Sequence, residues 1–264
     1  MQIGTVTLWL PMNQLQSVVG LVGNVALLAL LLFLILHYRI ERNGLRAFVS
    51  KCTDGRPRDL GMLLTLAGII HSHVQRANDP AFVPLPLFAE LGATPLSVLL
   101  RGGCCSGLSR LYILSLNAMG VRAGQVTLYH ASGRAQHCLV EVWLADTPVL
   151  VDPMYGFYFV NARGELIGLR SLLNGEVPRF VPLPLSVHDS YPPNDYYNFA
   201  FVRTKTANWT KSPLRRGAYR VLRWVTRERI DRMVQPSFLE WPQLMLASTT
   251  VTAIVAFNLL LAFW

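Results

Sequence analysis

Two neighbouring stretches of the chain decide its fold: residues 103–120, with the sequence GCCSGLSRLYILSLNAMG, and residues 137–153, with the sequence HCLVEVWLADTPVLVDP. In the first stretch apolar residues recur every three or four positions, which predicts a helix from about Ser106 to Met119 with one buried face. Gly120 then supplies the stop signal. Cys105 would lie at the helix N-terminus, where unpaired N–H groups and the positive end of the helix dipole favour an ionised sulfur.

The second stretch and the residues before it change to a period of two, which is typical of strands. We predict three neighbouring strands, over residues 121–129, 138–144 and 148–152. His137 heads the second of these strands and Asp152 ends the third. Their separation of fifteen residues fits a tight antiparallel pair, so the imidazole and the carboxylate can meet.

A thiol, an imidazole and a carboxylate therefore follow one another in the order Cys105, His137, Asp152. A thiol becomes a good nucleophile when a nearby imidazole takes its proton and a third group orients that imidazole. The pattern predicts covalent catalysis within an α+β fold, in which a helix carrying the Cys packs on an antiparallel sheet carrying the His and the Asp.

These motifs resemble those of the transglutaminase-like superfamily of papain-type cysteine enzymes. The family pattern of Gly-x-Cys, an amphipathic helix and a Gly fifteen residues after the Cys selects Cys105 over Cys104. The pattern His-x-x-x-Glu-Val matches residues 137–142, and Asp-Pro matches residues 152–153. The resemblance implies a transglutaminase-like core, with Cys105 as nucleophile, His137 as base and Asp152 as the group that orients it. It covers residues 95–154, under a quarter of the chain.

The resemblance leaves two functions open. As an enzyme the protein would transfer or hydrolyse an acyl group of an amide or ester substrate, in the manner of an amidase, protease or transamidase, through a thioester intermediate. However, many members carry an aromatic residue beside the Cys and another two positions after the His, where this chain has Ser106 and Leu139. The alternative is a transglutaminase-like subunit that is catalytically weak or inactive and serves as a membrane-bound assembly or interaction protein.

A metal site and a thiol redox relay are the other interpretations of the Cys and His residues. The pairs His71-x-His73, Cys104-Cys105 and His137-Cys138 do not have the spacing of zinc ligands, so we predict no metal and no other cofactor. A redox relay through Cys104 and Cys105 would need a strained vicinal disulfide.

Two uncharged apolar runs, Ser17–Leu36 and Leu244–Trp264, are each long enough to cross a hydrocarbon core. Asn24 lies in the first run and Asn258 in the second, and each could hydrogen-bond to the other or to a partner helix. We divide the chain into a short non-cytoplasmic N-terminus (1–16), a transmembrane helix (17–37), a cytoplasmic transglutaminase-like domain (38–212), a basic amphipathic juxtamembrane segment (213–242) and a second transmembrane helix (243–264).

The distribution of Lys and Arg residues predicts the orientation of the chain in the membrane and the class of its partners. The net charge is +9, and most Lys and Arg residues flank the inner ends of the two runs. The positive-inside rule therefore places the central segment in the cytoplasm of an integral membrane protein, which we expect in a bacterial inner membrane. That reducing compartment also keeps the thiols free. Outside the flanks basic residues are sparse, so we expect no nucleic acid partner.

A basic helix over residues 213–235 has the pattern of an interfacial helix on anionic lipid, and a solvated helix leading into the second span is the alternative. A membrane-associated substrate and membrane protein partners would suit this location. Further elements are predicted as helices over 59–76 and 95–100, a short helix within 164–173, and strands over 155–160 and 198–209.

Overall fold

The computed structural model describes residues 12–73, 94–129, 135–144, 147–186, 204–205, 213–226 and 240–263. The chain forms two compact units. The first contains the chain up to Ile40 and again from Gln243 onward, and the second is Glu41–Pro242. We refer to them as the helical-pair unit and the central unit.

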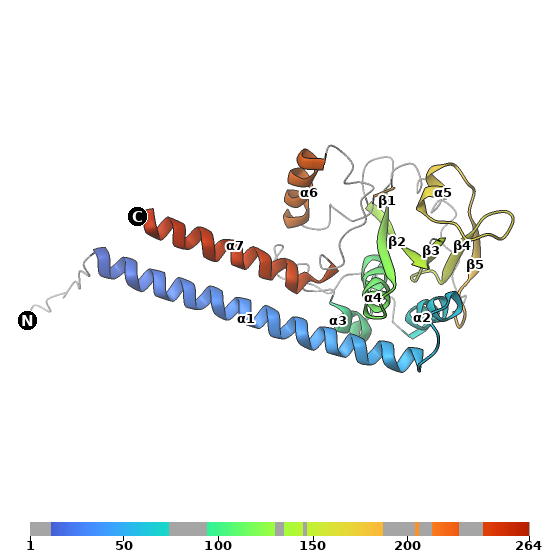
Figure 1. Cartoon of the computed structure of the whole chain (residues 1–264), viewed down its shortest axis with the longest axis horizontal. Coiled ribbons are helices and arrows are strands. Elements are labelled where there is room, and N and C mark those ends of the chain that lie inside the picture. The colour runs from blue at the N-terminus through green and yellow to red at the C-terminus, as the bar shows by residue number, and fades with distance from the viewer. Residues whose placement is uncertain are drawn as a thin grey trace, which may run out of the picture. The chain divides into compact units, whose positions relative to one another are not determined.

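The helical-pair unit consists of the first part of α1 (Met12–Thr53) and nearly all of α7 (Pro242–Phe263). Both helices are long and apolar enough to span a membrane. The two helices are antiparallel, because Gln16 Nε2 donates to the Leu261 carbonyl at 2.7 Å while His37 Nδ1 lies 3.0 Å from Gln243 Nε2. Figure 1 shows them side by side.

A reciprocal amide pair joins the two helices near their middle. Asn24 Nδ2 donates to Asn258 Oδ1 at 3.1 Å, and Asn258 Nδ2 donates to Asn24 Oδ1 at 2.8 Å. The predicted hydrogen bond between these residues is confirmed. Gly23 allows the helices to approach closely, since a Cβ there would lie 2.5 Å from the ring of Phe257.

The helix α1 is longer than the span predicted over residues 17–37. Hydropathy marks only its apolar part, and the polar residues that follow continue the helix to Thr53. Asp54 and Gly55 then adopt positive φ values of 43° and 70°, which end the helix.

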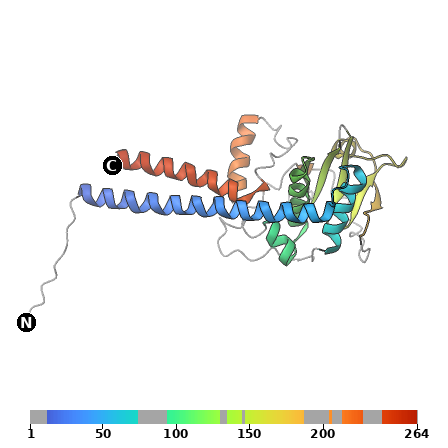
Figure 2. The same ribbon diagram turned by 60° about the horizontal axis from the view of Figure 1, so that its bottom comes forward.

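The central unit is built on one antiparallel sheet with the strand order β5-β4-β3-β2-β1-β6. Figures 1 and 2 show β1 to β5 side by side. The strands are β1 (Arg122–Tyr129), β2 (Ala135–Leu144), β3 (Thr147–Asp152), β4 (Phe157–Val160), β5 (Arg179–Pro182) and β6 (Thr204–Lys205). The unit is therefore α+β, as the sequence predicts.

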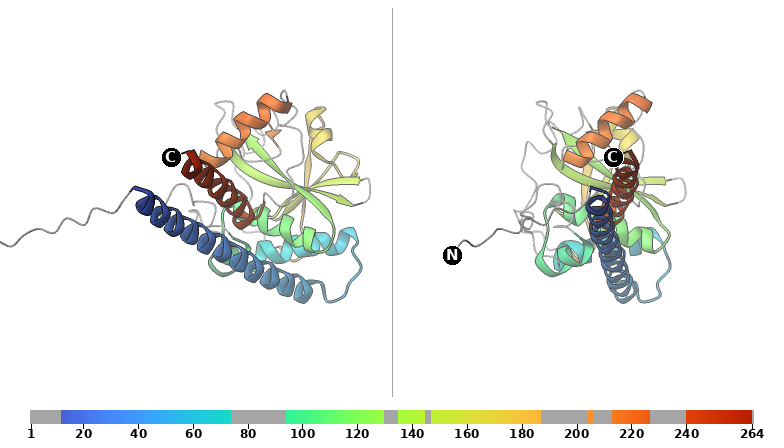
Figure 3. Two further views of the ribbon diagram at one scale, coloured as in Figure 1. Left: turned by 60° about the vertical axis from the view of Figure 1, so that its left-hand side comes forward. Right: turned by 90° about the vertical axis from the view of Figure 1, so that its left-hand side faces the viewer.

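Besides the end of α1, the described part of the central unit contains five helices. Four of them are α2 (Leu60–His73), α3 (Pro95–Arg101), α5 (Leu169–Leu173) and α6 (Pro213–Thr226). A fifth, α4 (Cys105–Ala118), packs against β1 and β2 and is buried along most of its length. Figure 3 shows α4 beside the sheet with α2 next to it.

Side-chain hydrogen bonds fix the position of α4. The hydroxyl of Ser109 donates to the Cys138 carbonyl of β2 at 3.1 Å, and the hydroxyl of Tyr112 donates to the Leu63 carbonyl of α2 at 2.9 Å. Both donors are buried, so losing either bond would leave a polar group without compensation. The helix that carries Cys105 is thus held from two sides.

A buried carboxylate ties α3 to α1 within the central unit. Glu41 Oε1 accepts from the Thr94 hydroxyl at 2.7 Å, and Glu41 Oε2 accepts from the Leu96 N–H at 2.8 Å. The Glu41 carboxylate thus provides an acceptor for the Leu96 N–H, one of the N–H groups at the start of α3 that have no partner within the helix. Because α3 leads directly to Cys104 and Cys105, Glu41 helps to set where the thiols lie.

Most predicted elements agree with the structure, and two differ from it. The predicted strand over 155–160 begins only at Phe157, because residues 153–156 form a turn in which Gly156 has a φ of 76°. The strand predicted from Cys138 begins at Ala135, since β2 pairs with β1 as far as Tyr129. Residues 74–76, 198–203, 206–209 and 227–235 of predicted elements lie outside the described residues.

Candidate active site

Cys105 occupies the first helical position of α4, as the sequence predicts. Two glycines let α3 approach this point closely: a Cβ on Gly103 would lie 3.1 Å from Val98 Cγ1, and one on Gly107 would lie 3.3 Å from Val98 Cγ2. The Cys105 side chain is half-buried. Its sulfur is therefore presented at the N-terminal end of a buried helix.

Cys104, whose thiol lies beside that of Cys105, is the residue immediately before α4. A hydrogen bond to Cys105, with burial as the next cause, raises the pKa of Cys104 to about 12. Its sulfur also lies 3.3 Å from the Ser106 hydroxyl. Cys104 therefore remains a neutral thiol at physiological pH, which leaves Cys105 as the candidate nucleophile of the pair.

His137 and Asp152 form a buried ion pair. The His137 Nε2 atom lies 3.0 Å from Asp152 Oδ2, and Asp152 is fully buried. Burial alone would lower the pKa of His137, but the charge of Asp152, its hydrogen bond and the interactions with Cys105 outweigh burial and raise that pKa to about 9. The imidazole is therefore protonated at neutral pH.

The turn after β3 fixes the Asp152 carboxylate. Its Oδ1 atom accepts from the Met154 N–H at 2.9 Å and from the Tyr155 N–H at 3.0 Å. On the opposite side of this turn, His71 Nδ1 lies 3.1 Å from the Met154 carbonyl. Asp152 thus precedes the turn and also pairs with His137. The two N–H groups of this turn hold its carboxylate in place.

The structure brings all three predicted residues together. Strand register places His137, Leu139 and Glu141 on one face of β2 with Leu150 and Asp152 of β3, and Cys105 lies close enough to His137 to raise the pKa of its imidazole. Sequence reasoning missed Tyr155, whose ring centroid lies 5.5 Å from that of His137 at an angle of 42°. A single aromatic residue after the Asp-Pro motif gave no signal of this contact.

The two positions that depart from the family pattern have different surroundings. Leu139 is fully buried in a cluster with Val126, Leu128 and Leu150, so it belongs to the core of the sheet and lines no cleft. Ser106 is half-buried and contacts Cys104. Among the described residues no group of three or more His, Cys, Asp or Glu side chains could hold a metal.

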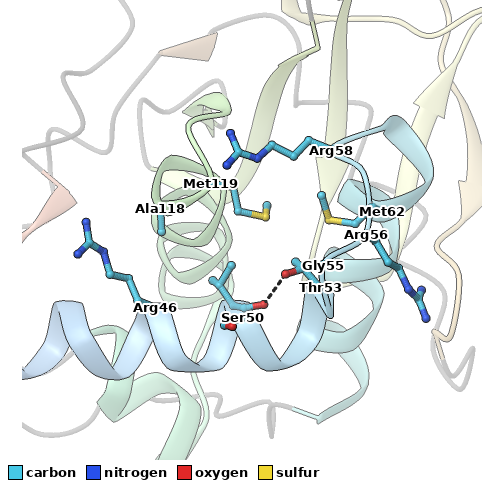
Figure 4. Close-up of a pocket in the computed structure, with 10 residues that line it drawn as sticks. Arg46, Ser50, Thr53, Gly55, Arg56, Arg58, Met62, Ala118 and Met119 are labelled. Carbon is cyan, nitrogen blue, oxygen red and sulfur yellow. Dashed lines mark hydrogen bonds between the residues drawn. The ribbon is translucent and has the colours of Figure 1, made fainter.

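A cavity of about 420 Å³ lies elsewhere on the central unit, between α1, α2 and α4. Figure 4 shows Arg46 and Arg58 on either side of Ala118 and Met119. The last turns of α1 and α4 both line this cavity, and arginines are favourable beside the carbonyl ends of helices. Arg46, Arg56 and Arg58 give this cavity a positively charged lining.

Comparisons with known proteins give little guidance. No family model matches the chain, and no curated protein matches it. Two similar solved structures are a candidate cysteine protease from Cytophaga hutchinsonii (15% identity, TM-score 0.36) and a TGase (14% identity, TM-score 0.35). They cover 52% and 44% of this chain, which spans only 41% and 32% of theirs. At such TM-scores neither likeness establishes a common fold, so function is argued from the geometry of the site.

Proposed function

We propose that the protein is a membrane-anchored cysteine enzyme that transfers or hydrolyses acyl groups through a Cys105-His137-Asp152 triad. The observation that carries this proposal is the convergence of a thiol at a helix N-terminus with a buried, protonated imidazole that is paired to a fixed carboxylate. This is the arrangement by which a thiol is activated and its partner imidazole is oriented.

The reaction would proceed in two steps. In the first, the ionised Cys105 sulfur attacks the carbonyl carbon of an amide or ester, and the His137 imidazolium gives its proton to the leaving amine or alcohol. This forms a thioester. In the second, water or an amine gives a proton to His137 and attacks the thioester carbonyl, and the Cys105 sulfur leaves.

Each neighbouring group has a role in this scheme. Because Nε2 of His137 is engaged by Asp152, Nδ1 is the ring nitrogen that would exchange a proton with the substrate and with Cys105. The Cys104 thiol would donate a hydrogen bond to the negative sulfur. The backbone N–H of Cys105, at the start of α4, would stabilise the oxyanion.

The membrane setting suits a membrane-associated substrate or a membrane protein partner. The antiparallel helical pair places His37 and Gln243 at one end, so the segment between them would leave the bilayer on a single side. With basic residues on that side, the positive-inside rule favours a cytoplasmic domain, as in a bacterial inner membrane.

Site-specific alkylation tests the proposal. We expect iodoacetamide to label Cys105 at pH 6 much faster than Cys52, whose pKa is raised by burial. The Cys52→Ala variant is the matched control and should keep the fast labelling of Cys105, whereas His137→Ala should lose it. The rate of hydrolysis of an activated ester should likewise be kept in the control variant and lost in His137→Ala. Labelling of Cys105 no faster than that of Cys52 would contradict the enzyme.

The second candidate function is a catalytically weak or inactive assembly subunit, which is favoured by Ser106 at the position beside Cys105 where many members of the resembled family carry an aromatic residue. In that case Cys105→Ala would leave the cellular phenotype intact, whereas deletion of the chain would not. Loss of the phenotype in Cys105→Ala, together with normal protein levels, would exclude this alternative.

A further inference from the structure

The helix α6 (Pro213–Thr226) has an unusual distribution of charge and apolar surface. Its fourteen residues include four arginines and no acidic residue. Four large apolar side chains are nevertheless exposed along it: Trp224 is 83% exposed, Val225 64%, Val221 61% and Leu222 37%. An apolar surface of this kind marks a site of contact with another molecule or with lipid.

The helical repeat sorts these side chains onto separate faces. Ala218, Val221 and Val225 are three and four residues apart and line one exposed stripe. A second exposed stripe contains Arg216, Arg220 and Arg223 at the same spacings. The two stripes give α6 an apolar edge and a cationic edge.

Trp224 lies between the two stripes. It is nine residues from Arg215, which corresponds to half a turn of rotation, so the two side chains leave opposite sides of the helix. Arg215 is buried and Tyr219 is half-buried, and this side therefore faces the central unit. The outward side presents an indole flanked by arginine on one edge and valine on the other.

We propose that α6 lies on the surface of an anionic phospholipid bilayer, with Val221 and Val225 among the acyl chains, Trp224 at the headgroup boundary and the exposed arginines Arg216, Arg220 and Arg223 on lipid phosphates. Indole rings favour this boundary, and arginines there are attracted by anionic headgroups. The proposal is independent of the catalytic function.

The length of the connection to α7 favours lipid as the occupant of this face. Only fifteen residues, 227–241, separate the end of α6 from the start of α7. Fully extended, they span at most about 50 Å. If α7 crosses the bilayer, α6 cannot lie farther than this from the point at which α7 enters, so a lipid surface is always within reach.

Fluorescence quenching on the full chain tests the proposal. The protein would be placed in nanodiscs of phosphatidylcholine with and without phosphatidylglycerol, and the Trp224 signal taken as the difference between wild type and Trp224→Phe. With phosphatidylglycerol we expect quenching by lipids brominated on their acyl chains and protection from aqueous acrylamide. A variant with Arg216, Arg220 and Arg223 changed to Gln should lose the quenching by brominated lipids and the protection from acrylamide. The reason is that each arginine strengthens binding to the anionic surface about fivefold.

The matched control removes three exposed arginines elsewhere on the central unit, by changing Arg163, Arg170 and Arg179 to Gln. It should leave the Trp224 quenching unchanged. Quenching by acrylamide and not by brominated lipid would overturn the proposal, because Trp224 would then face water. Protection from both quenchers would also overturn it, because α6 would then be covered by protein.

Discussion

The His137-Asp152 pair shows how a fully buried carboxylate can determine the protonation of its neighbour. Desolvation opposes the imidazolium, but the carboxylate lies 3.0 Å away and is itself held by two backbone N–H groups. Removing the charge of either partner would leave the other buried and uncompensated. The pair therefore makes the stability of the fold depend on pH through one proton.

The first prediction concerns stability. The pKa of His137 is about 9 in the folded state and 6.5 ordinarily, so folding tightens its hold on the proton. The stability from this proton is present below pH 6.5 and is lost as pH rises towards 9, on the order of 1–3 kcal/mol. Denaturant unfolding of Asp152→Asn between pH 6 and 9 should show a weaker dependence than wild type. Equal slopes would contradict the pairing.

The second prediction concerns activity and rests on the proposed function. Because the His137 imidazolium protonates the leaving group, the rate of ester or amide cleavage should fall as pH rises above about 9. Asp152→Asn should lower the rate at neutral pH by roughly 10²- to 10⁴-fold and move this limb to lower pH. A pH-rate profile of both proteins decides this, and an unmoved limb in the variant would argue against the role of Asp152.

At the scale of elements, α2 (Leu60–His73) depends on one glycine for its close approach to the segment after β5. A Cβ on Gly68 would overlap the Pro184 carbonyl oxygen, a contact that only a backbone shift can relieve. The same helix contains Gly61, where a Cβ would make only an ordinary 3.5 Å contact with Asp59 Oδ1.

The third prediction compares these two glycines. Gly68→Ala should destabilise the protein by about 2 kcal/mol or more through overpacking. Gly61→Ala should instead be neutral or stabilising by up to about 1 kcal/mol, because alanine is the better helix former. Thermal unfolding of the two variants provides the measurement. Equal stability of the two would show that α2 does not pack on Pro184 in this way.

The sequence predicted the helix and the strands that carry the candidate site, but it did not predict the contacts that other elements make with them. Apolar periodicity placed the helix of Cys105 within one residue at each end, because its buried faces repeat regularly. Chain order alone could not show that Tyr155 contacts His137 or that Glu41 caps α3. Both are contacts between separate elements, and local periodicity carries no information about them.

At the scale of the whole molecule, the helical-pair unit has a polar contact between its two apolar helices. The reciprocal Asn24-Asn258 bonds would be embedded in hydrocarbon if the helices span a membrane, where each amide needs a partner. The close contact of Gly23 with Phe257 adds packing beside it. Together these contacts fix the pairing of α1 with α7.

The fourth prediction concerns this amide pair. Asn24→Leu should weaken the association of the two helices by about 1 kcal/mol, because it leaves the Asn258 amide without its partner. The double variant Asn24→Leu, Asn258→Leu should recover part of the loss. Disulfide trapping between cysteines placed at neighbouring positions of the two helices reports the association, and an unchanged yield in Asn24→Leu would contradict the prediction.

The continuity of α1 has a mechanical consequence. Within the central unit, Glu41 belongs to an unbroken stretch of α1 and accepts hydrogen bonds from the Thr94 hydroxyl and the Leu96 N–H at the start of α3. One alanine inserted after Glu41 would turn this carboxylate by about 100° relative to the rest of α1 in the central unit. The two hydrogen bonds would then be lost, and with them a contact that holds the segment leading to the thiols.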